Sequence, residues 1–419
     1  SVARVNFAPP EVSSNQINLD FNFHTVGDEN DTKTFATEQT SFEVTITASN
    51  LSSFYESPLT LGYTLQGVTV NDFDPSLSSL TGTVSLTTAN NFKATLSFTV
   101  DTLLSSKNLV ISTPLGDSDA LQLRPINNIA GSGGDRVYSL SGGNEKVHIF
   151  ETNGTFTAAK NGVIRLLMVG GGGGGGSDMG GGGGAGGYIE ETEFAVTAGS
   201  YTISIGNGGA GAPAGTFGPR GTNGQPTLAF GLTALGGGGG ASDHDSSSYP
   251  AGNGGSGGGG SGGRLSSGNY GGLPGITTDP SQGNNGAGSG VTWYPGGGGG
   301  AGEPGQRQPA HGGDGRLTDI TGTPTYFAGG GGGSGYSAVG GNGGEGGGGG
   351  GAVGTTTGGS GYNDGNPGGG GSTNSQTNRP GGSAGANTGG GGGGGSHYAS
   401  NNNGGAGGSG IVVIRYTLD

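Results

Sequence analysis

Polar and apolar residues alternate along several short stretches in the first 130 residues. Residues 42–47 give the clearest case, because Phe42, Val44 and Ile46 are separated by polar residues. This two-residue period is typical of a β-strand with one buried face. Similar runs follow at 59–65, 82–86, 94–100 and 108–112. Several short strands at this spacing predict an antiparallel β-sandwich.

The apolar strands of the remaining chain stand beside runs of glycine. Residues 146–150 and 155–158 flank Asn153-Gly154, which favours a tight hairpin. Residues 163–169 are almost continuously apolar, as in a strand buried on both faces, and lead directly into seven glycines. Further strands are predicted at 188–196, 201–205, 227–235 and 411–416. The last is strongly apolar and needs a partner sheet, because such a strand would aggregate if exposed.

The composition of the chain changes near residue 130. Only five of the 109 glycines among 419 residues precede residue 131. The others form recurring runs, the longest at 170–176 and 389–395. The glycine content approaches that of collagen, but the strict three-residue period is missing and proline is scarce. A flexible linker is the usual interpretation of such low complexity, whereas the apolar strands at both ends favour an ordered domain.

Ordered polyglycine needs dense backbone pairing, because glycine loses the most entropy on folding and has no side chain to bury. Polyproline II helices supply it: they have three residues per turn and no internal hydrogen bonds, so every N–H and C=O points to a neighbour. A seven-residue run would span about 21 Å. We therefore predict an all-β fold with an N-terminal antiparallel sandwich, followed by a domain of β-strands and packed polyglycine helices.

These features divide the chain into four predicted parts. They are an extended arm (1–34) containing Pro9-Pro10, a sandwich (35–128), a linker (129–145) and a glycine-rich domain with displayed loops (146–419). No apolar run reaches 18 residues, and the first residues lack the layout of a signal peptide. We expect no insertion into a membrane.

The glycine-rich part resembles a known family. The strings RLLMVGGGGGGG and TAGSYTISIGNGGAG and the closing GGAGGSGIVVIRY are similar to the glycine-rich domain of phage tail and virion proteins and of some marine bacterial surface proteins. The resemblance covers about residues 146–419. Tail-fibre adhesins of T-even-like phages use polyglycine helices to hold loops that bind the host. The resemblance implies a virion protein that acts outside cells.

The N-terminal part also resembles a family. The run LTLGYTLQGVTVNDFDPSLSSLTGTVSLTT, followed by KATLSFTV, is similar to Calx-beta-like sandwich modules in virion proteins of marine and cyanobacterial phages, over about residues 35–125. Calx-beta modules can bind calcium through clustered carboxylates, which makes Asp72 and Asp74 the candidates. The acidic run usual in these modules is reduced here to Asp101. Calcium needs several converging oxygen ligands, so we expect solvated carboxylates and no cofactor, with calcium as the alternative.

Charge and motifs exclude several classes of function. The net charge of −14 repels phosphate backbones, so we expect no nucleic-acid partner. There is no cysteine for disulfides or thiolate-bound zinc. We expect Asp243-His244-Asp245 to be a solvated loop. The G-x-G-x-x-G matches precede no helix pattern, and no G-x-S-x-G elbow stands between a strand and a helix. We expect no enzyme.

Aromatic residues in the segments between glycine runs are the candidate binding groups. They are interleaved with Asn, Ser and Asp, and tyrosine with small polar residues is the composition of antibody-like binding loops. Capping of the bundle ends is the alternative role. The candidate receptor-binding residues are Tyr249, Tyr270, Trp293, Tyr294, Tyr362, His397 and Tyr398.

These patterns together favour a non-enzymatic tail-fibre or surface-fibre adhesin of a phage. It would bind a host surface glycan or protein through its loops, and other virion proteins through its arm and sandwich. Homo-oligomerisation is left open. A structural decoration protein of a capsid, tube or filament is one alternative, and a bacterial surface or matrix adhesin is another.

Overall fold

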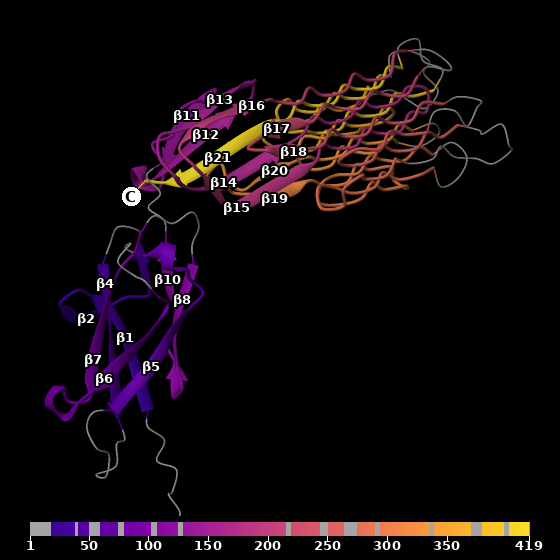
Figure 1. The fold of residues 1–419 in the computed structure, drawn as a ribbon. Coiled ribbons are helices and arrows are strands. Elements are labelled where there is room, and N and C mark those ends of the chain that lie inside the picture. Colours follow the sequence, from indigo (N-terminus) through magenta and orange to yellow (C-terminus); the bar gives the residue numbers. More distant parts are fainter. Residues whose placement is uncertain are drawn as a thin grey trace, which may run out of the picture. The chain divides into compact units, whose positions relative to one another are not determined.

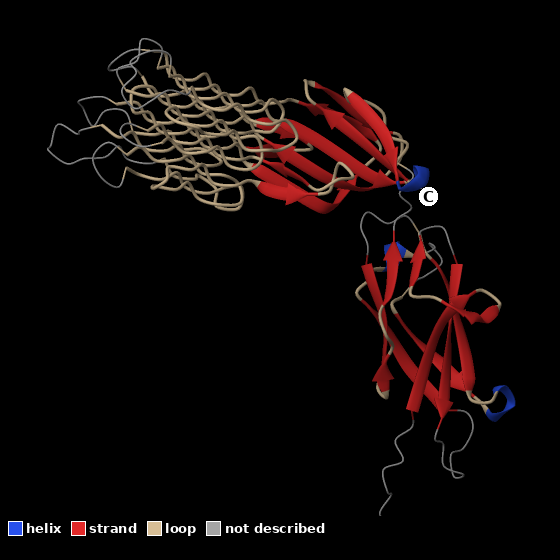
Figure 2. Ribbon diagram, turned by 180° about the vertical axis from the view of Figure 1, so that it is seen from behind, coloured by secondary structure: helices blue, strands red, loops and turns tan. Residues whose placement is uncertain are grey.

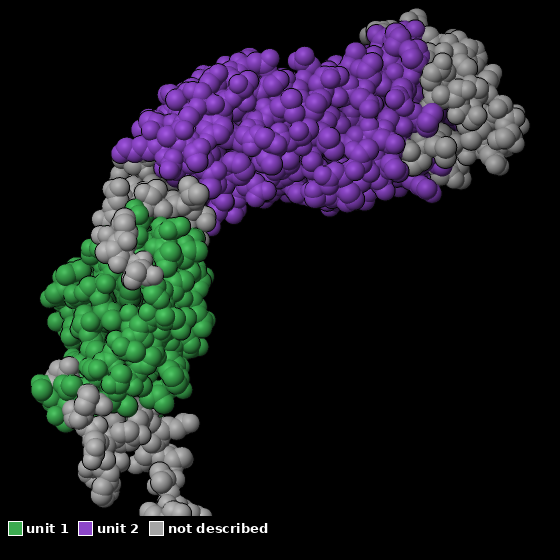
Figure 3. All heavy atoms as spheres, viewed as in Figure 1, with its two compact units in different colours: residues 1–127 green, residues 128–419 purple. Residues whose placement is uncertain are grey.

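The computed structural model describes residues 18–37, 41–49, 59–73, 79–101, 107–124, 129–214, 219–243, 250–263, 275–289, 294–335, 339–369, 379–397 and 402–418. The chain forms two compact units, residues 1–127 and 128–419 (Figure 3). Strands dominate the regular structure of both (Figure 2). The helices of the described part are three short 3-10 turns, η1 (Val70–Asp72), η2 (Thr88–Asn90) and η3 (Ser141–Gly143). No helix among these residues has the length and apolarity to cross a membrane. The predicted all-β class is confirmed.

The first unit contains two sheets. One has the order β2-β1-β4-β7 and the other β3-β10-β8-β5-β6, with β9 paired to β8. The first sheet comprises β1 (Asn18–Thr25), β2 (Asp28–Thr32), β4 (Ser41–Ser49) and β7 (Lys93–Thr99). The second comprises β3 (Phe35–Thr37), β5 (Leu59–Gln66), β6 (Thr81–Leu86), β8 (Lys107–Thr113), β9 (Gly116–Asp117) and β10 (Leu121–Arg124). All pairs are antiparallel except β3 with β10.

The two sheets pack against each other through apolar side chains. Phe42 and Val44 of β4 share one core cluster with Leu109 and Ile111 of β8, and all four are fully buried. Ile46, the third apolar residue of the alternation in β4, is also fully buried. The predicted sandwich is confirmed, and the two-residue period identifies its inner face correctly.

Strands β1 and β2 occupy the stretch that was predicted to be an extended arm. β1 pairs with β4 in continuous register from Asn18 opposite Ser49 to Thr25 opposite Phe42. Its sequence carries the same alternation as β4, with Phe23 in the core. The boundary predicted at residue 35 is therefore wrong, because the sandwich includes residues from Asn18 onward. The predicted arm at 1–17 lies outside the described residues.

The second unit contains an antiparallel five-stranded sheet in the order β11-β12-β21-β14-β15 (Figure 1). Its strands are β11 (Arg136–Leu140), β12 (Glu145–Phe150), β21 (Ile411–Thr417), β14 (Gly162–Val169) and β15 (Tyr188–Val196). Three two-stranded pairs accompany it: β13 (Gly154–Ala158) with β16 (Gly199–Ile203), β17 (Thr227–Ala229) with β18 (Leu232–Ala234), and β19 (Arg316–Thr318) with β20 (Thr325–Phe327). β11 lies within the predicted linker, so residues 136–140 belong to this unit.

The neighbouring strands β14 and β21 are buried on both faces. Leu166 and Val412 belong to one core cluster, whereas Leu167 and Val413 belong to a second cluster with Phe327 on the opposite side. This confirms the interpretation of residues 163–169 as a strand buried on both faces. It also confirms that the apolar C-terminal strand pairs within a sheet.

One prediction of strand pairing and one prediction of strand length are wrong. β12 and β13 do not form a hairpin around Asn153-Gly154, because β11 and β21 occupy both edges of β12, and β13 pairs with β16 instead. Residues 227–235 are not one strand but a hairpin. Phe230 and Gly231 have φ angles of 53° and 77° between β17 and β18, the left-handed pair that a two-residue turn requires.

Candidate functional site

The glycine runs continue directly from the sheet into a bundle of extended rods (Figure 1). β14 leads into residues 170–176, here called the central rod. The rod at 180–187 leads into β15, and the rod at 404–410 leads into β21. The antiparallel pairing of β14 with both strands is thereby carried on into the rods.

Successive amides of the central rod point to different neighbours. The seven N–H groups donate to carbonyl oxygens at 2.9–3.0 Å, and the accepting segment repeats every three residues. The amides of 170, 173 and 176 donate to residues 187, 184 and 181 of the next rod. Those of 171 and 174 donate to residues 225 and 222, and those of 172 and 175 donate to residues 408 and 405. A β-strand alternates between two directions and cannot produce this pattern. Three residues per turn is the repeat of a polyproline II helix.

The carbonyl groups of the central rod follow the same repeat toward three further segments. The carbonyls of 171 and 174 accept from the N–H groups of 237 and 240, at 2.8 Å. Those of 172 and 175 accept from 209 and 212, and those of 173 and 176 accept from 392 and 395, all at 2.8–2.9 Å. The central rod is thus surrounded by six hydrogen-bonded neighbours. All residues from 170 to 187 are buried, so backbone pairing replaces the side-chain core of an ordinary domain.

The interior of the bundle has no room for side chains. A Cβ atom on Gly172 would lie 1.9 Å from the carbonyl oxygen of Gly390, and one on Gly173 would lie 2.2 Å from that of Gly238. Real Cβ atoms essentially never come within 3.0 Å of such an atom. Packing therefore dictates the sequence inside the bundle. Side chains that recognise a partner are confined to its outer faces and ends.

The end of the bundle opposite the sheet is here called the distal end. It is marked by the turn at 177–179, which joins the central rod to the rod at 180–187. The N–H of Ser334 donates to Gly180 at 3.0 Å, which places Ser334 at this end.

A pocket of about 270 Å³ opens beside Ser334 at the distal end. Its lining consists of Tyr294, Pro295, Arg307, Gln308, Pro309, Ala310, Ser334, Gly335 and Val339. Tyr294 is half-buried, and Val339 is 58% exposed. The pocket combines a ring and aliphatic groups with one guanidinium, a surface typical of sites that hold a small ligand or a protruding side chain.

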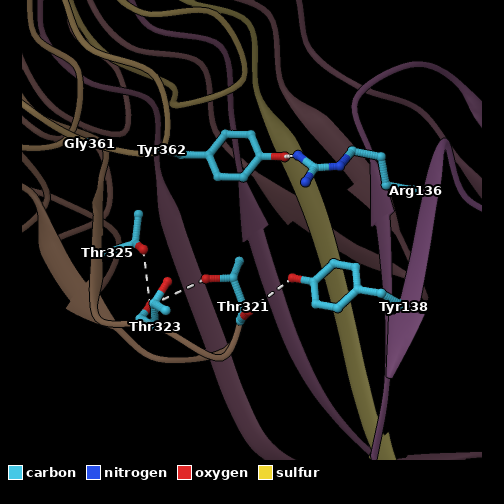
Figure 4. A pocket seen from close by; sticks show the side chains of 7 residues that line it. All are labelled: Arg136, Tyr138, Thr321, Thr323, Thr325, Gly361 and Tyr362. Atoms are coloured by element: carbon cyan, nitrogen blue, oxygen red, sulfur yellow. Dashed lines mark hydrogen bonds between the residues drawn. The ribbon is translucent and has the colours of Figure 1, made fainter. Parts of the chain in front are cut away.

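A second pocket, of about 390 Å³, lies beside β11 and the loop between β19 and β20 (Figure 4). The hydroxyl of Tyr362 donates to Oε1 of Glu151 at 2.7 Å and accepts from a guanidinium nitrogen of Arg136 at 2.5 Å. Burial and the neighbouring Glu151 raise the pKa of Tyr362 above its usual value. The hydroxyl of Tyr138 donates to the carbonyl of Thr321 at 2.9 Å. The hydroxyl of Tyr362 is therefore held by hydrogen bonds within the protein.

The structure separates the described members of the predicted receptor-binding set. Tyr294 lines the distal pocket, whereas Tyr362 packs on Phe327 of β20, beside the sheet, with ring centres 5.6 Å apart. His397 lies at the distal end, with Nδ1 2.5 Å from Oδ1 of Asp178. The other members, Tyr249, Tyr270, Trp293 and Tyr398, lie outside the described residues.

Asp72 differs from the expectation of a solvated carboxylate. It is 5% exposed and bound by Lys107 Nζ at 2.6 and 2.8 Å and by the N–H of Thr69 at 2.5 Å. A buried carboxylate needs such partners, because removing its charge from water is costly. The prediction of solvation at Asp72 is therefore wrong. The ammonium group of Lys107 occupies the position next to this carboxylate that a calcium ion would take. Asp74 lies outside the described residues.

Three metal-ligating side chains come together at the distal end. Within the described ranges, Asp178, Asp243 and His397 form the group of this kind, with ligand atoms within 4.8 Å of one another. The sequence places Asp243 beside His244 and Asp245, which lie outside the described residues. No local spacing could have indicated the observed trio, because three rods distant in sequence supply it.

Comparison with known proteins gives a result for the glycine-rich part of the chain. A search of the curated proteins gives no match. The sequence model of the family described as "Glycine-rich domain" matches residues 151–384, which is more than half of the chain. The predicted glycine-rich domain is thereby confirmed. The chain belongs to the Glycine-rich domain family.

Proposed function

We propose that this chain is a non-enzymatic adhesin of a phage virion, on a tail fibre or surface fibre. The rod bundle serves as a rigid support, and the distal end carries the surface that binds a host receptor. The observation that carries the proposal is the pocket around Tyr294, at the end of a bundle whose interior admits no side chain.

The bundle suits this role because it fixes positions without side-chain packing. Each amide of the central rod is hydrogen-bonded to a neighbouring rod. Ordering of the rods is thus complete before any partner binds, and pre-organisation of this kind lowers the entropic cost of binding. A receptor would meet groups that are already in place.

The lining of the distal pocket suits a surface glycan or a protein side chain. Tyr294 offers an aromatic face, and the neighbouring Pro295 and Val339 add apolar surface. Arg307 supplies a positive charge beside them, in a chain with a net charge of −14. Guanidinium groups bind carboxylates and phosphates well. An anionic sugar or an acidic protein side chain is the preferred occupant.

The N-terminal unit would make the assembly contacts in this proposal. Its two packed sheets agree in class with the Calx-beta-like modules that its sequence resembles. Other virion proteins are the proposed partners of this unit. The same contacts would serve a decoration protein, so the distal pocket decides between the two functions.

The test is binding of the labelled full chain to a panel of bacterial strains and to a glycan array. Replacing Tyr294 and Arg307 by alanine should lower affinity at least about thirtyfold, since central interface residues commonly contribute 2 kcal/mol or more. Tyr326→Ala is the matched control, because Tyr326 is an exposed tyrosine on β20 beside the sheet. It should bind as the wild type does.

Unchanged binding by the double variant would refute the role of the distal pocket. Absence of binding to every strain, together with electron micrographs that show the chain repeated over a capsid or tube, would favour the decoration protein instead.

A further inference from the structure

The three ligand-type side chains at the distal end come from three separate rods. Asp178 lies in the turn after the central rod, Asp243 follows the rod at 236–241, and His397 follows the rod at 389–395. The N–H of Asp243 donates to the carbonyl of Asp178 at 3.0 Å, which fixes the first two chains against each other. This convergence is independent of the pocket around Tyr294.

The trio gathers two carboxylates and one imidazole around a buried aspartate. Asp178 is 2% exposed, and its side chain is 3% exposed. Two carboxylates and one imidazole carry a net charge of −1 when the histidine is protonated and −2 when it is neutral. His397 already pairs with Asp178, and buried charged groups are generally paired or coordinate a metal. A divalent cation would neutralise the trio with a neutral histidine.

The donor atoms indicate which class of cation fits. Calcium and magnesium prefer oxygen ligands alone, whereas imidazole nitrogen suits zinc and other first-row transition metals. Zinc accepts both histidine nitrogen and carboxylate oxygen, and sites with three protein ligands keep the fourth position open to water. The side chain of His397 is 8% exposed, whereas Asp243 is only partly buried, so an ion has access to the trio from the side of Asp243.

The observed spacing needs only small side-chain movements to hold an ion. Zinc binds nitrogen and oxygen at about 2.0–2.2 Å, which places two tetrahedral ligands about 3.3 Å apart. The direct Nδ1–Oδ1 distance between His397 and Asp178 is 2.5 Å, and the remaining ligand distances stay within 4.8 Å. The hydrogen bond would be exchanged for two bonds to the metal through shifts of about 1 Å.

We propose that Asp178, Asp243 and His397 form a binding site for a divalent transition-metal ion, with zinc as the reference ion. The bound ion joins three rods at the distal end. It thereby fixes the positions from which the chain continues after residues 243 and 397.

The test is a titration of the metal-free full chain, prepared with a chelator, with zinc chloride by calorimetry. We expect a saturable site with one zinc per chain that is lost in Asp243→Asn. A melting-temperature rise of several degrees should accompany saturation, because a ligand that binds only the folded state stabilises it. Magnesium and calcium at the same concentration should produce no such rise.

Asp243→Asn keeps the hydrogen bond between Asp178 and His397, so its fold can be checked without metal. Its melting temperature in chelator gives the baseline against which the effect of zinc on this variant is measured. His397→Gln is the second variant and should also lose the site. Glu193→Gln removes an exposed carboxylate of β15 and should bind zinc normally. Zinc binding that is absent in the wild type, or equal in Asp243→Asn and Glu193→Gln, would overturn the proposal.

Discussion

Replacing Gly173 by alanine is the most informative single change in the bundle. The added Cβ would lie 2.2 Å from the carbonyl oxygen of Gly238 and 2.5 Å from its carbon. An ordinary contact is 3.4–4 Å long, so one rod must move by about 1 Å. Hydrogen bonds of 2.9 Å do not survive such a displacement.

The affected bonds set the size of the effect. The N–H of Gly173 donates to Gly184 and its carbonyl accepts from Gly392, both at 2.9 Å, while Gly238 donates to Ser256 and accepts from Gly184 at 2.8 Å. A buried polar group left without a partner costs about 1–3 kcal/mol. Loss of two such bonds lowers the free energy of unfolding by about 4 kcal/mol. The melting temperature of the glycine-rich unit should fall by about 10 °C.

The sign of the effect separates a packed bundle from a flexible linker. In a flexible segment, glycine to alanine is neutral or slightly stabilising, because alanine restricts the unfolded chain. Calorimetric melting of the full chain measures the change, with Ala210→Val as the control. Ala210 lies in a neighbouring rod but is exposed, so a larger side chain there should have little effect. An unchanged or raised melting temperature for Gly173→Ala would refute the packing described for the rods.

Two further predictions concern ionisable groups. Burial lowers the pKa of His148 below 6.5, so the unfolded chain takes up a proton that the folded chain does not. The free energy of unfolding should fall by up to about 1.4 kcal/mol per pH unit as pH drops below 6.5. Thermal melting between pH 7.5 and 5.5 measures this trend, and His148→Gln should weaken it. Lys107→Ala leaves the buried Asp72 without the ammonium group that pairs with it and should lower the free energy of unfolding of the sandwich by about 3 kcal/mol, measured by urea unfolding. The double variant Lys107→Met with Asp72→Leu should recover much of this stability. Equal stability of Lys107→Ala and wild type would contradict a role for this ion pair.

The sequence predicts the strands of this protein better than their partners. Phe42, Val44 and Ile46 reveal a half-buried strand because side-chain direction alternates locally. Pairing is a tertiary property. Asn153-Gly154 carries a strong hairpin signal, yet β12 already has neighbours on both edges. The strand β1 carries the same alternation as β4 and could have been recognised, whereas the preceding prolines favoured an extended arm.

The candidate sites show the same division between local and tertiary information. The need for backbone pairing between glycine runs follows from the entropy of glycine and its lack of a side chain. The trio of Asp178, Asp243 and His397 does not follow from any spacing, because rod alignment alone brings it together. The solvation predicted for Asp72 is wrong because Lys107, which neutralises it, lies 35 residues away in the sequence. Composition places Tyr362 among the candidate loop residues, although its partner Glu151 belongs to the region of the sheet.

The geometry of the rods is the central claim, and a crystal structure of the glycine-rich unit at high resolution tests it most directly. The backbone angles of residues 170–176 and 390–395 should cluster near φ −75° and ψ +145°. Gly389 is excluded, because its φ of 67° places it in a turn. Each successive amide should bond to a different rod with a repeat of three residues. Angles in the β region with a two-residue repeat, or no common conformation along these residues, would contradict the account.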